Sequence, residues 1–286
     1  MIDKNIFFSR VGQLKKDEGD ILEKNMIWIF GSPRSGTTWL RKLMSGNPEN
    51  IIWNEPYLGY HLQLLQNQQY RDDYVFSEYY KKNWLPDLRN FILSCTYSHS
   101  RKIDKKIIIK EPSGSVGSPL LLECLPNSKI IFLLRDGRDV VDSLIDAHNP
   151  NSWNVKLSSI PLTNQKIRDE QIKYHSEKWK RITEIVFDAF KKHNPNLRYL
   201  LKYEELKNNT FDQLKKTYEF IGENINDKDL NDIIERYDFE NIPPEEKGSG
   251  KFYRSATPGA WKKNFSRSEQ QLMNSIMGNT LAQFDY

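Results

Sequence analysis

Short apolar runs alternate along the chain with longer segments in which apolar residues recur every three or four positions. The runs cover residues 26–30, 51–53, 107–109, 129–134 and 197–201. Strands that are apolar on both faces are typical of a parallel sheet covered by helices on both sides. A length of 286 residues is within the range of one hydrophobic core. The pattern therefore predicts a single α/β domain, 1–286, with a central parallel sheet flanked by helices.

The periodic segments predict the helices, and two stretches without periodicity predict irregular structure. Helical spacing covers 37–44, 118–125, 138–148, a long segment that ends at residue 192, and 266–277. Residues 57–100 hold several helical stretches rich in aromatic side chains. Residues 1–25 are predicted to be a polar arm. Residues 243–260 hold three Pro and three Gly among charged residues, which predicts a mobile loop.

The stretch 26–44, MIWIFGSPRSGTTWLRKLM, predicts a strand, a Gly/Ser/Pro loop and a helix that begins at Thr37. The backbone N–H groups of such a loop bind anions, together with the positive end of the helix dipole. A loop for nucleoside triphosphates carries Lys directly after its second Gly. Here Thr37 takes that place, and the cation is Arg34 inside the loop. This suits a ligand whose terminal anion lies over the loop itself.

Polar side chains follow each predicted strand, namely Arg34, Glu55, Lys110, Arg135 and Tyr203. Because ligands of open parallel sheets bind outside the carboxyl ends of the strands, these side chains are predicted to converge at one edge. Arg135 is followed eight residues later by Ser143, in LLRDGRDVVDSL. A guanidinium and a hydroxyl suit a phosphate group. The alternative is a surface salt bridge of Arg135 with Asp139 or Asp142.

Charge and cysteine content limit the classes of function. The chain has 42 Lys and Arg against 38 Asp and Glu, a net charge of +4. This balance is too even for a nucleic-acid-binding protein, and it is compatible with a small anionic ligand. Cys95 and Cys124 fit no metal or redox spacing, and no signal peptide or membrane-spanning run is visible. A cytoplasmic protein without metal, nucleic acid or membrane span is therefore expected, with its oligomeric state open.

Three motifs, in order along the chain, resemble those of sulfotransferases that use 3′-phosphoadenosine 5′-phosphosulfate (PAPS). GSPRSGTTW resembles their 5′-phosphosulfate loop, and LLRDGRDVVDSL resembles the segment whose Arg and Ser hold the 3′-phosphate. FYRSATPGAWKKNF resembles the loop R-K-G-x-x-G-x-W-K of the cytosolic enzymes. There Ser255 and Ala256 replace Lys and Gly, so that one cationic contact to the 3′-phosphate is missing. The resemblance covers residues 26 to about 266 and implies the P-loop-like fold of that family.

The resemblance implies a set of residues that bind PAPS. Arg254 is expected to reach the 3′-phosphate, so that residues 243–260 cover the cofactor. Tyr203 resembles a tyrosine that closes over the cofactor, and Trp39 and Phe239 resemble contacts to the adenine. Core packing is the alternative for these three aromatic side chains. The full set is Arg34, Ser35, Gly36, Thr37, Thr38, Trp39, Arg135, Ser143, Tyr203, Phe239, Arg254, Ser255 and Ala256.

The catalytic base divides the family. Cytosolic sulfotransferases use a His after a K-T dipeptide, and Pro112 takes that position here. Tyrosylprotein and several bacterial sulfotransferases use a Glu after the loop helix, which Glu55 resembles at 21 residues after Arg34. Lys110 resembles a lysine that contacts the sulfuryl group. For Glu55 the alternative is a turn carboxylate before a proline. The fallback bases are His61, His99 and His148.

The resulting hypothesis is a PAPS-dependent sulfotransferase that acts on a hydroxyl in preference to an amine. Glu55 is expected to take the acceptor proton, while Arg34, Lys110 and the loop N–H groups stabilise charge on the sulfuryl oxygens and the leaving phosphate. Small-molecule, carbohydrate, lipid and tyrosine-type acceptors all remain open. One alternative is a nucleoside-triphosphate kinase with Asp136 as a Mg²⁺ ligand. Another is a non-catalytic protein that binds adenosine 3′,5′-bisphosphate (PAP).

Overall fold

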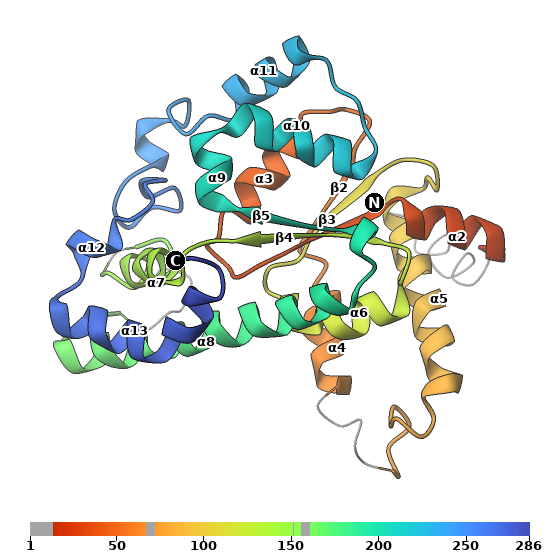
Figure 1. The fold of residues 1–286 in the computed structure, drawn as a ribbon, viewed down its shortest axis with the longest axis horizontal. Coiled ribbons are helices and arrows are strands. Elements are labelled where there is room, and N and C mark those ends of the chain that lie inside the picture. Colours follow the sequence, from red (N-terminus) through yellow and green to blue (C-terminus); the bar gives the residue numbers. More distant parts are fainter. Residues whose placement is uncertain (1–13, 67–71, 151, 156–160) are drawn as a thin grey trace.

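The structure, a computed structural model, describes residues 14–66, 72–150, 152–155 and 161–286 (Figure 1). Its strands are β1 (Met26–Phe30), β2 (Ile51–Asn54), β3 (Ile107–Lys110), β4 (Lys129–Leu134) and β5 (Arg198–Lys202). Its helices are α2 (Lys16–Lys24), α3 (Thr37–Met44), α4 (Leu58–Gln66), α5 (Lys81–Ser100), α6 (Ser118–Cys124), α7 (Gly137–Asp146), α8 (Gln165–Lys192), α9 (Tyr203–Asn208), α10 (Thr210–Ile221), α11 (Asp227–Arg236), α12 (Trp261–Asn264) and α13 (Arg267–Ala282). Each predicted apolar run is thus a strand, within one residue at either end.

The five strands form one sheet with the order β2-β3-β1-β4-β5. Every neighbouring pair is parallel. In the register of the central strand, Met26 lies opposite Ile107 on β3, and Ile27 lies opposite Lys129 on β4. The prediction of a parallel sheet is therefore confirmed, and the carboxyl ends of all five strands lie at the same edge.

Two layers of helices cover the sheet because successive side chains of a strand point to opposite faces. Trp28 and Phe30 on β1 pack on one side with helices that include α5, α6, α8 and α13. Ile27 and Ile29 pack on the other side with α3, α9, α10 and α11. Figure 1 shows these two layers below and above the sheet. All four side chains are fully buried, which explains why the run has no polar alternation.

The predicted polar arm, residues 1–25, contains a helix in its described part. Residues 16–24 form helix α2, and residues 1–13 lie outside the described residues. Leu22 is buried in the core, and the fully buried Glu23 carboxylate accepts a hydrogen bond from Arg89 on α5. The helix is missed because it buries few apolar side chains, and its main anchor is an ion pair with a residue far along the chain.

The segments at the carboxyl edge of the sheet position the site. Helix α7 begins directly after β4, and Figure 1 shows the arrow of β4 pointing towards it. Residues 243–260, predicted to be a loop, contain one 3-10 turn (Pro244–Glu246) and an isolated bridge between Lys247 and Tyr253. Among the described residues, no helix is both long and apolar enough to cross a membrane.

Candidate active site

The loop between β1 and α3 has the backbone of an anion-binding turn. The N–H of Ser35 bonds to the carbonyl of Ser32 at 3.1 Å, and Gly36 adopts φ +90°. A Cβ at Gly36 would lie 2.5 Å from Cδ2 of Tyr203, so that a larger residue would displace this ring. No side chain caps the N-terminus of α3, whose first residue is Thr37. Its N–H groups are therefore available to a bound anion.

A cavity of about 500 Å³ opens at this edge of the sheet. Of the predicted site residues, Ser35 alone does not line it. Ser35 is nevertheless buried, and its Oγ has no hydrogen-bond partner. The other predicted residues converge as expected, namely Arg34, Gly36, Thr37, Thr38, Trp39, Glu55, Lys110, Arg135, Ser143, Tyr203, Phe239, Arg254, Ser255 and Ala256.

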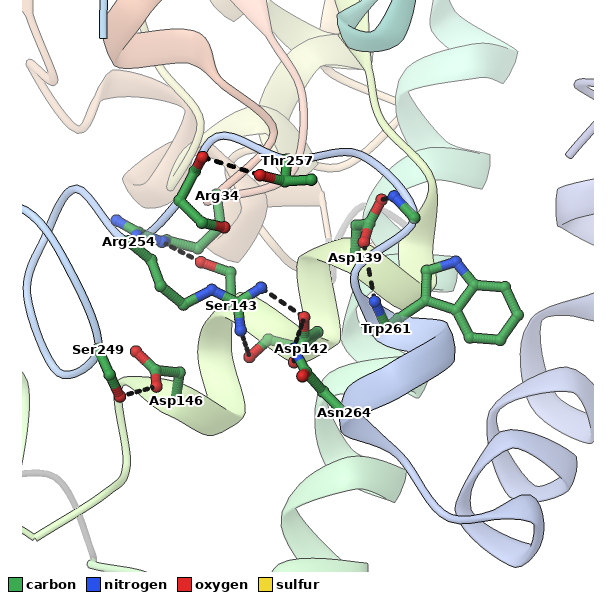
Figure 2. Close-up of polar contacts among 12 residues, drawn as sticks. Arg34, Asp139, Asp142, Ser143, Asp146, Ser249, Arg254, Thr257, Trp261 and Asn264 are labelled. Atoms are coloured by element: carbon green, nitrogen blue, oxygen red, sulfur yellow. Dashed lines mark hydrogen bonds and ion pairs between the residues drawn. The ribbon is translucent and has the colours of Figure 1, made fainter. Parts of the chain in front are cut away.

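Three arginines that line the cavity lie close to one another, and Figure 2 shows two of them, Arg34 and Arg254, beside Ser143. The Nε of Arg34 donates to the Oγ of Ser143 at 3.0 Å. Nη1 of Arg135 donates to the carbonyl of Arg34 at 3.0 Å, and its guanidinium lies 4.4 Å from the ring centre of Tyr203. Arg254 pairs with Asp142, one residue before Ser143. We call Arg34, Arg135 and Arg254 the arginine cluster.

The arginine cluster fits an anion of high charge. Burial, and then repulsion from Arg135 and Arg254, lowers the pKa of the Arg34 guanidinium to about 10. The Nε of Arg135 is buried without a hydrogen-bond partner, although this side chain lines the cavity. A buried, unpaired donor is costly, and a phosphate oxygen would satisfy it while relieving the repulsion. The residues present therefore fit the phosphate groups of PAPS.

Three carboxylates on one face of α7 hold the segment that covers the cavity (Figure 2). Asp146 accepts hydrogen bonds from the Ser249 hydroxyl at 2.7 Å and from the N–H of Gly250 at 2.8 Å. Asp142 binds Arg254 and also accepts from the side-chain amide of Asn264. Asp139 accepts from the N–H of Gly259 at 2.6 Å and from that of Trp261 at 3.3 Å. We call Asp139, Asp142 and Asp146 the α7 carboxylates.

Glu55 and Lys110 form an ion pair at the other end of the site. The Nζ of Lys110 bonds to Oε1 of Glu55 and lies 3.5 Å from Oγ1 of Thr38. Ser113 donates to Oε2 of Glu55 at 3.1 Å. The backbone of Glu55 adopts φ +50°, and its N–H bonds to the carbonyl of Lys110 at 2.8 Å. The carboxylate, the ammonium and the start of α3 thus lie together.

Glu111 is a second carboxyl group behind this pair, and sequence reasoning did not select it. Its side chain is fully buried, and burial, followed by the charge of Glu55, raises its pKa to about 8. The N–H groups of Tyr57 and Leu58, at the start of α4, face this carboxyl and partly oppose the shift, although neither makes a hydrogen bond of good geometry. The surroundings of Glu111 therefore favour its protonated form.

Aromatic side chains line the cavity where adenine contacts were predicted. Trp39 packs edge-on against Tyr203 with ring centres 6.0 Å apart, and its Nε1 donates to the carbonyl of Tyr237. Lys207 lies 5.8 Å from the Trp39 ring centre. Phe239 lines the same cavity. These rings can contact a flat heterocycle in the cavity, and they can also pack in the core.

The fallback residues lie elsewhere. The Nε2 of His99 is 3.0 Å from the carbonyl of Ile52, and His148 pairs with the buried His175 at 3.1 Å. Neither of these rings lines the cavity, and nor does His61. Asp136, the proposed magnesium ligand of the kinase hypothesis, instead caps α7 and binds Arg138. In the described part of the chain, no three His, Cys, Asp or Glu side chains are grouped to hold a metal ion.

Several residues of the site were not among those predicted from the sequence. Phe252 offers its carbonyl to Nη2 of Arg34 at 2.6 Å, and its ring lies 4.7 Å from that guanidinium. Trp153 lies on the Arg34 side chain as well, at 5.8 Å. Trp153 belongs to a loop with little sequence pattern, whereas Phe252 begins the motif FYRSATPGAWKKNF, in which only Arg254, Ser255 and Ala256 were predicted to bind the cofactor. Ser113 had a weak signal, since it stands three residues after Lys110 at the end of β3.

Comparison with known proteins identifies the family. The family model described as the sulfotransferase domain matches residues 24–285. The chain therefore belongs to the sulfotransferase family. Protein-tyrosine sulfotransferase A of Caenorhabditis elegans is 23% identical over 233 residues, which are 80% of this chain and 58% of that protein. Sulfotransferase 1E1 of Bos taurus is 26% identical over 264 residues, 83% of this chain and 77% of that protein.

Solved structures show the same fold. A mouse sulfotransferase in complex with PAP superposes with a TM-score of 0.55 at 16% identity, over 94% of each chain. Retinol dehydratase in complex with retinol and PAP gives a TM-score of 0.56 at 15% identity, over 93% of this chain and 85% of that one. The predicted fold is confirmed, and the predicted PAPS-dependent sulfotransferase is confirmed at the level of the family. The chain spans little more than half the length of its Caenorhabditis relative.

Proposed function

We propose that this protein transfers a sulfuryl group from PAPS to a hydroxyl acceptor, with Glu55 as the general base. The observation that carries the proposal is the placement of Glu55, Lys110 and the N-terminus of α3 in one cavity with the arginine cluster. An enzyme of this kind needs a proton acceptor at one end of the transferring group and cations at the other. A hydroxyl is proposed in preference to an amine.

The surroundings of Glu55 support its role as the base. Lys110 binds one oxygen of the carboxylate and Ser113 donates to the other, which fixes its orientation. An ionised carboxylate has about four lone-pair sites, so these two bonds leave room for the acceptor O–H. Glu55 takes the acceptor proton, while Arg34, Lys110 and the N–H groups at the start of α3 stabilise the charge on the sulfuryl oxygens and the leaving phosphate.

The remaining residues hold the cofactor, which supplies the activated sulfuryl group when it is bound. Arg135 and Ser143 contact the 3′-phosphate, and Arg254 reaches it from the covering segment. The aromatic side chains of Trp39, Tyr203 and Phe239 contact the adenosine. Ser255 and Ala256 contribute backbone contacts only. Support for these roles comes from the shared cavity and from the unpaired donor of Arg135.

The acceptor is proposed to enter beside Tyr57 and Tyr60. Both rings are exposed, and they meet edge-on with centres 6.3 Å apart. The charge of Glu55 is the main cause that raises the pKa of the Tyr57 hydroxyl, so this ring stands beside the base. A phenol, a sugar, a lipid alcohol and a tyrosine side chain all fit such a wall.

A screen of these acceptors with labelled PAPS tests the reaction class, with amines as a parallel set. Turnover on any hydroxyl supports the proposal. Bound PAP with no turnover on any acceptor favours the non-catalytic binder.

The engagement of Asp136 with Arg138 speaks against the kinase. The free cysteines Cys95 and Cys124 support a reducing compartment such as the cytoplasm.

The Glu55→Gln variant tests the base. It keeps the shape and one acceptor oxygen but cannot take a proton, so turnover is expected to fall on the order of 10²–10⁴-fold. The affinity for PAP should hardly change. Glu49→Gln, at an exposed carboxylate paired with Lys105, is the matched control and should keep full turnover. Near-normal turnover of Glu55→Gln would reject this base and return the search to His61, His99 and His148.

A further inference from the structure

A carboxylate that does not line the cavity connects the ends of two strands that do contribute to it. Oε1 of Glu204 accepts a hydrogen bond from the N–H of Asp136 at 3.0 Å. Asp136 directly follows Arg135 in the chain, and Glu204 directly follows Tyr203. The guanidinium of Arg135 lies 4.4 Å from the ring centre of Tyr203. One carboxylate thus holds the backbone beside both members of this pair.

The second oxygen of Glu204 is held by Tyr286. The O–H of Tyr286 donates to Oε2 of Glu204 at 2.6 Å. Burial, and then the charge of Glu204, raises the pKa of this hydroxyl, so it stays protonated and remains a donor. A hydrogen bond to an ionised carboxylate is roughly twice as strong as one between neutral groups. Tyr286 therefore fixes the orientation of the Glu204 carboxylate.

The segment that carries Tyr286, residues 283–286, is anchored on β5. The Nζ of Lys202, the last residue of β5, donates to the carbonyl of Phe284 at 2.7 Å and lies 5.2 Å from the ring centre of Tyr286. The ring of Phe284 is buried and packs edge-on against Phe187 with centres 4.8 Å apart. Figure 1 shows this end of the chain beside the start of α7. The segment thus brings a hydroxyl to the edge of the sheet where the phosphates are proposed to bind.

We infer that Tyr286 is a positioning residue for the 3′-phosphate site, which acts on Arg135 through Glu204. The inference rests on the proposed function, which places the 3′-phosphate at Arg135 and Ser143. The N–H that Glu204 binds belongs to the peptide group between Arg135 and Asp136, so this bond fixes the backbone from which the guanidinium extends. Neither Tyr286 nor Glu204 lines the cavity, so both act through other residues. Without the Tyr286 hydroxyl, the Glu204 carboxylate can turn, and the guanidinium loses its fixed place.

Calorimetric titration with PAP and with adenosine 5′-phosphate tests this inference without any acceptor. The two ligands differ only in the 3′-phosphate, so the ratio of their dissociation constants measures its recognition. Tyr286→Phe removes only the hydroxyl. It is expected to weaken PAP binding about 3- to 10-fold and to change the affinity for adenosine 5′-phosphate less than about twofold.

A double-mutant cycle separates positioning from a purely structural role. In a protein that already carries Arg135→Ala, the hydroxyl of Tyr286 has no guanidinium left to position. Adding Tyr286→Phe should then change the affinity for PAP by less than about twofold. A purely structural role would produce the same loss with and without Arg135→Ala.

Tyr199→Phe is the matched control. It also removes a hydrogen-bonded tyrosine hydroxyl, since the O–H of Tyr199 on β5 donates to Oε1 of Gln213 at 3.2 Å, but Tyr199 does not line the cavity. The ratio of the two dissociation constants should stay that of the wild type. Circular-dichroism melting without ligand shows whether each variant is folded. If Tyr286→Phe is unfolded, Glu204→Gln, which keeps the shape but removes the charge, is read in its place with the same expectations.

Two results would overturn the inference. An unchanged ratio of the two dissociation constants in Tyr286→Phe would leave the hydroxyl no role in recognising the 3′-phosphate. An equal loss of PAP affinity with and without Arg135→Ala would make its role structural. A wild-type protein that binds PAP no better than adenosine 5′-phosphate is a different failure, because it would reject the proposed placement of the 3′-phosphate and this inference with it.

Discussion

Among the carboxyl groups of the described residues, Glu111 has the pKa that departs furthest from that of an exposed carboxyl group. It is fully buried beside Glu55, and the neighbouring Lys110 is already paired with Glu55. Burial is the larger cause of its raised pKa, and the charge of Glu55 is the second. The neutral acid is therefore the form that the native structure favours, and its ionisation opposes folding.

The protonation of Glu111 in the native and in the unfolded protein determines how the free energy of unfolding changes with pH. The pKa of Glu111 rises from 4.5 in the unfolded reference to about 8 in the native protein. Between these values the native state holds a proton that the unfolded state has released. The free energy of unfolding therefore falls as pH rises through this window, by an amount on the order of a few kcal/mol.

Glu111→Gln is expected to remove this decline, because the amide resembles the neutral acid and does not ionise. Urea titrations at several values between pH 5 and pH 8 measure the free energy of unfolding of both proteins. As pH rises, the free energy of unfolding of the wild type should fall towards that of Glu111→Gln, or below it. Glu23→Gln removes another fully buried carboxylate, one that is paired with Arg89, and controls for the loss of a buried acid. Parallel pH profiles for wild type and Glu111→Gln would contradict the prediction.

Single residues also show how much of the site could be predicted from the sequence. Arg34, Lys110 and Arg135 could be predicted because each follows an apolar strand at the carboxyl edge. Glu111 could not, since its burial depends on how closely the start of α4 approaches it. The direction of the Arg34 side chain was equally hidden, because it is set by Phe252, which lies 218 residues away.

At the scale of elements, helix α7 has two tasks. It presents Ser143 to the cavity, and its three carboxylates hold the covering segment 243–260 together with α12. The periodicity of residues 138–148 predicted the helix, because its apolar stripe is local. The partners of its polar face could not be predicted, since Asp142 and Arg254 lie 112 residues apart.

The covering segment is expected to become more ordered when cofactor binds. Its Pro and Gly content limits the apolar surface that it can bury, while Arg254 lies where a phosphate would attract it. Hydrogen exchange followed by mass spectrometry should show slower exchange over residues 243–260 when PAP is added. Exchange that stays the same with PAP demonstrably bound would mean that the segment is no lid.

The α7 carboxylates allow a second prediction, which concerns hydrogen exchange in separate parts of the covering segment. Asp146→Asn weakens the acceptor for the N–H of Gly250, so exchange in residues 248–253 should become faster by about tenfold or more without ligand. Residues 257–260 should be unaffected, because Asp139 still accepts from Gly259. Uniform acceleration along the whole segment would instead show that it opens as one unit.

At the scale of the whole molecule, cofactor binding should stabilise the fold. PAP is expected to raise the melting temperature, because it binds the native cavity and not the unfolded chain. At ~100 times its dissociation constant it should add about 2.7 kcal/mol to the free energy of unfolding. ATP with Mg²⁺ lacks a 3′-phosphate and should have a much smaller effect. Equal shifts with both nucleotides would count against the sulfotransferase assignment and revive the kinase.

The arginine cluster has a consequence for how the protein is made in the cell. The phosphate loop leaves the ribosome early, but Phe252 and Arg254, which complete the anion site, emerge about 10–40 s later at ~5–20 residues per second. During that interval the nascent chain contains the phosphate loop but not Phe252 and Arg254, which complete the anion site. The nucleotide can therefore give little help to early folding steps, so the sheet and the helices from α2 to α11 must begin to assemble by hydrophobic packing. The bound cofactor can therefore stabilise the fold only after Phe252 and Arg254 have been synthesised.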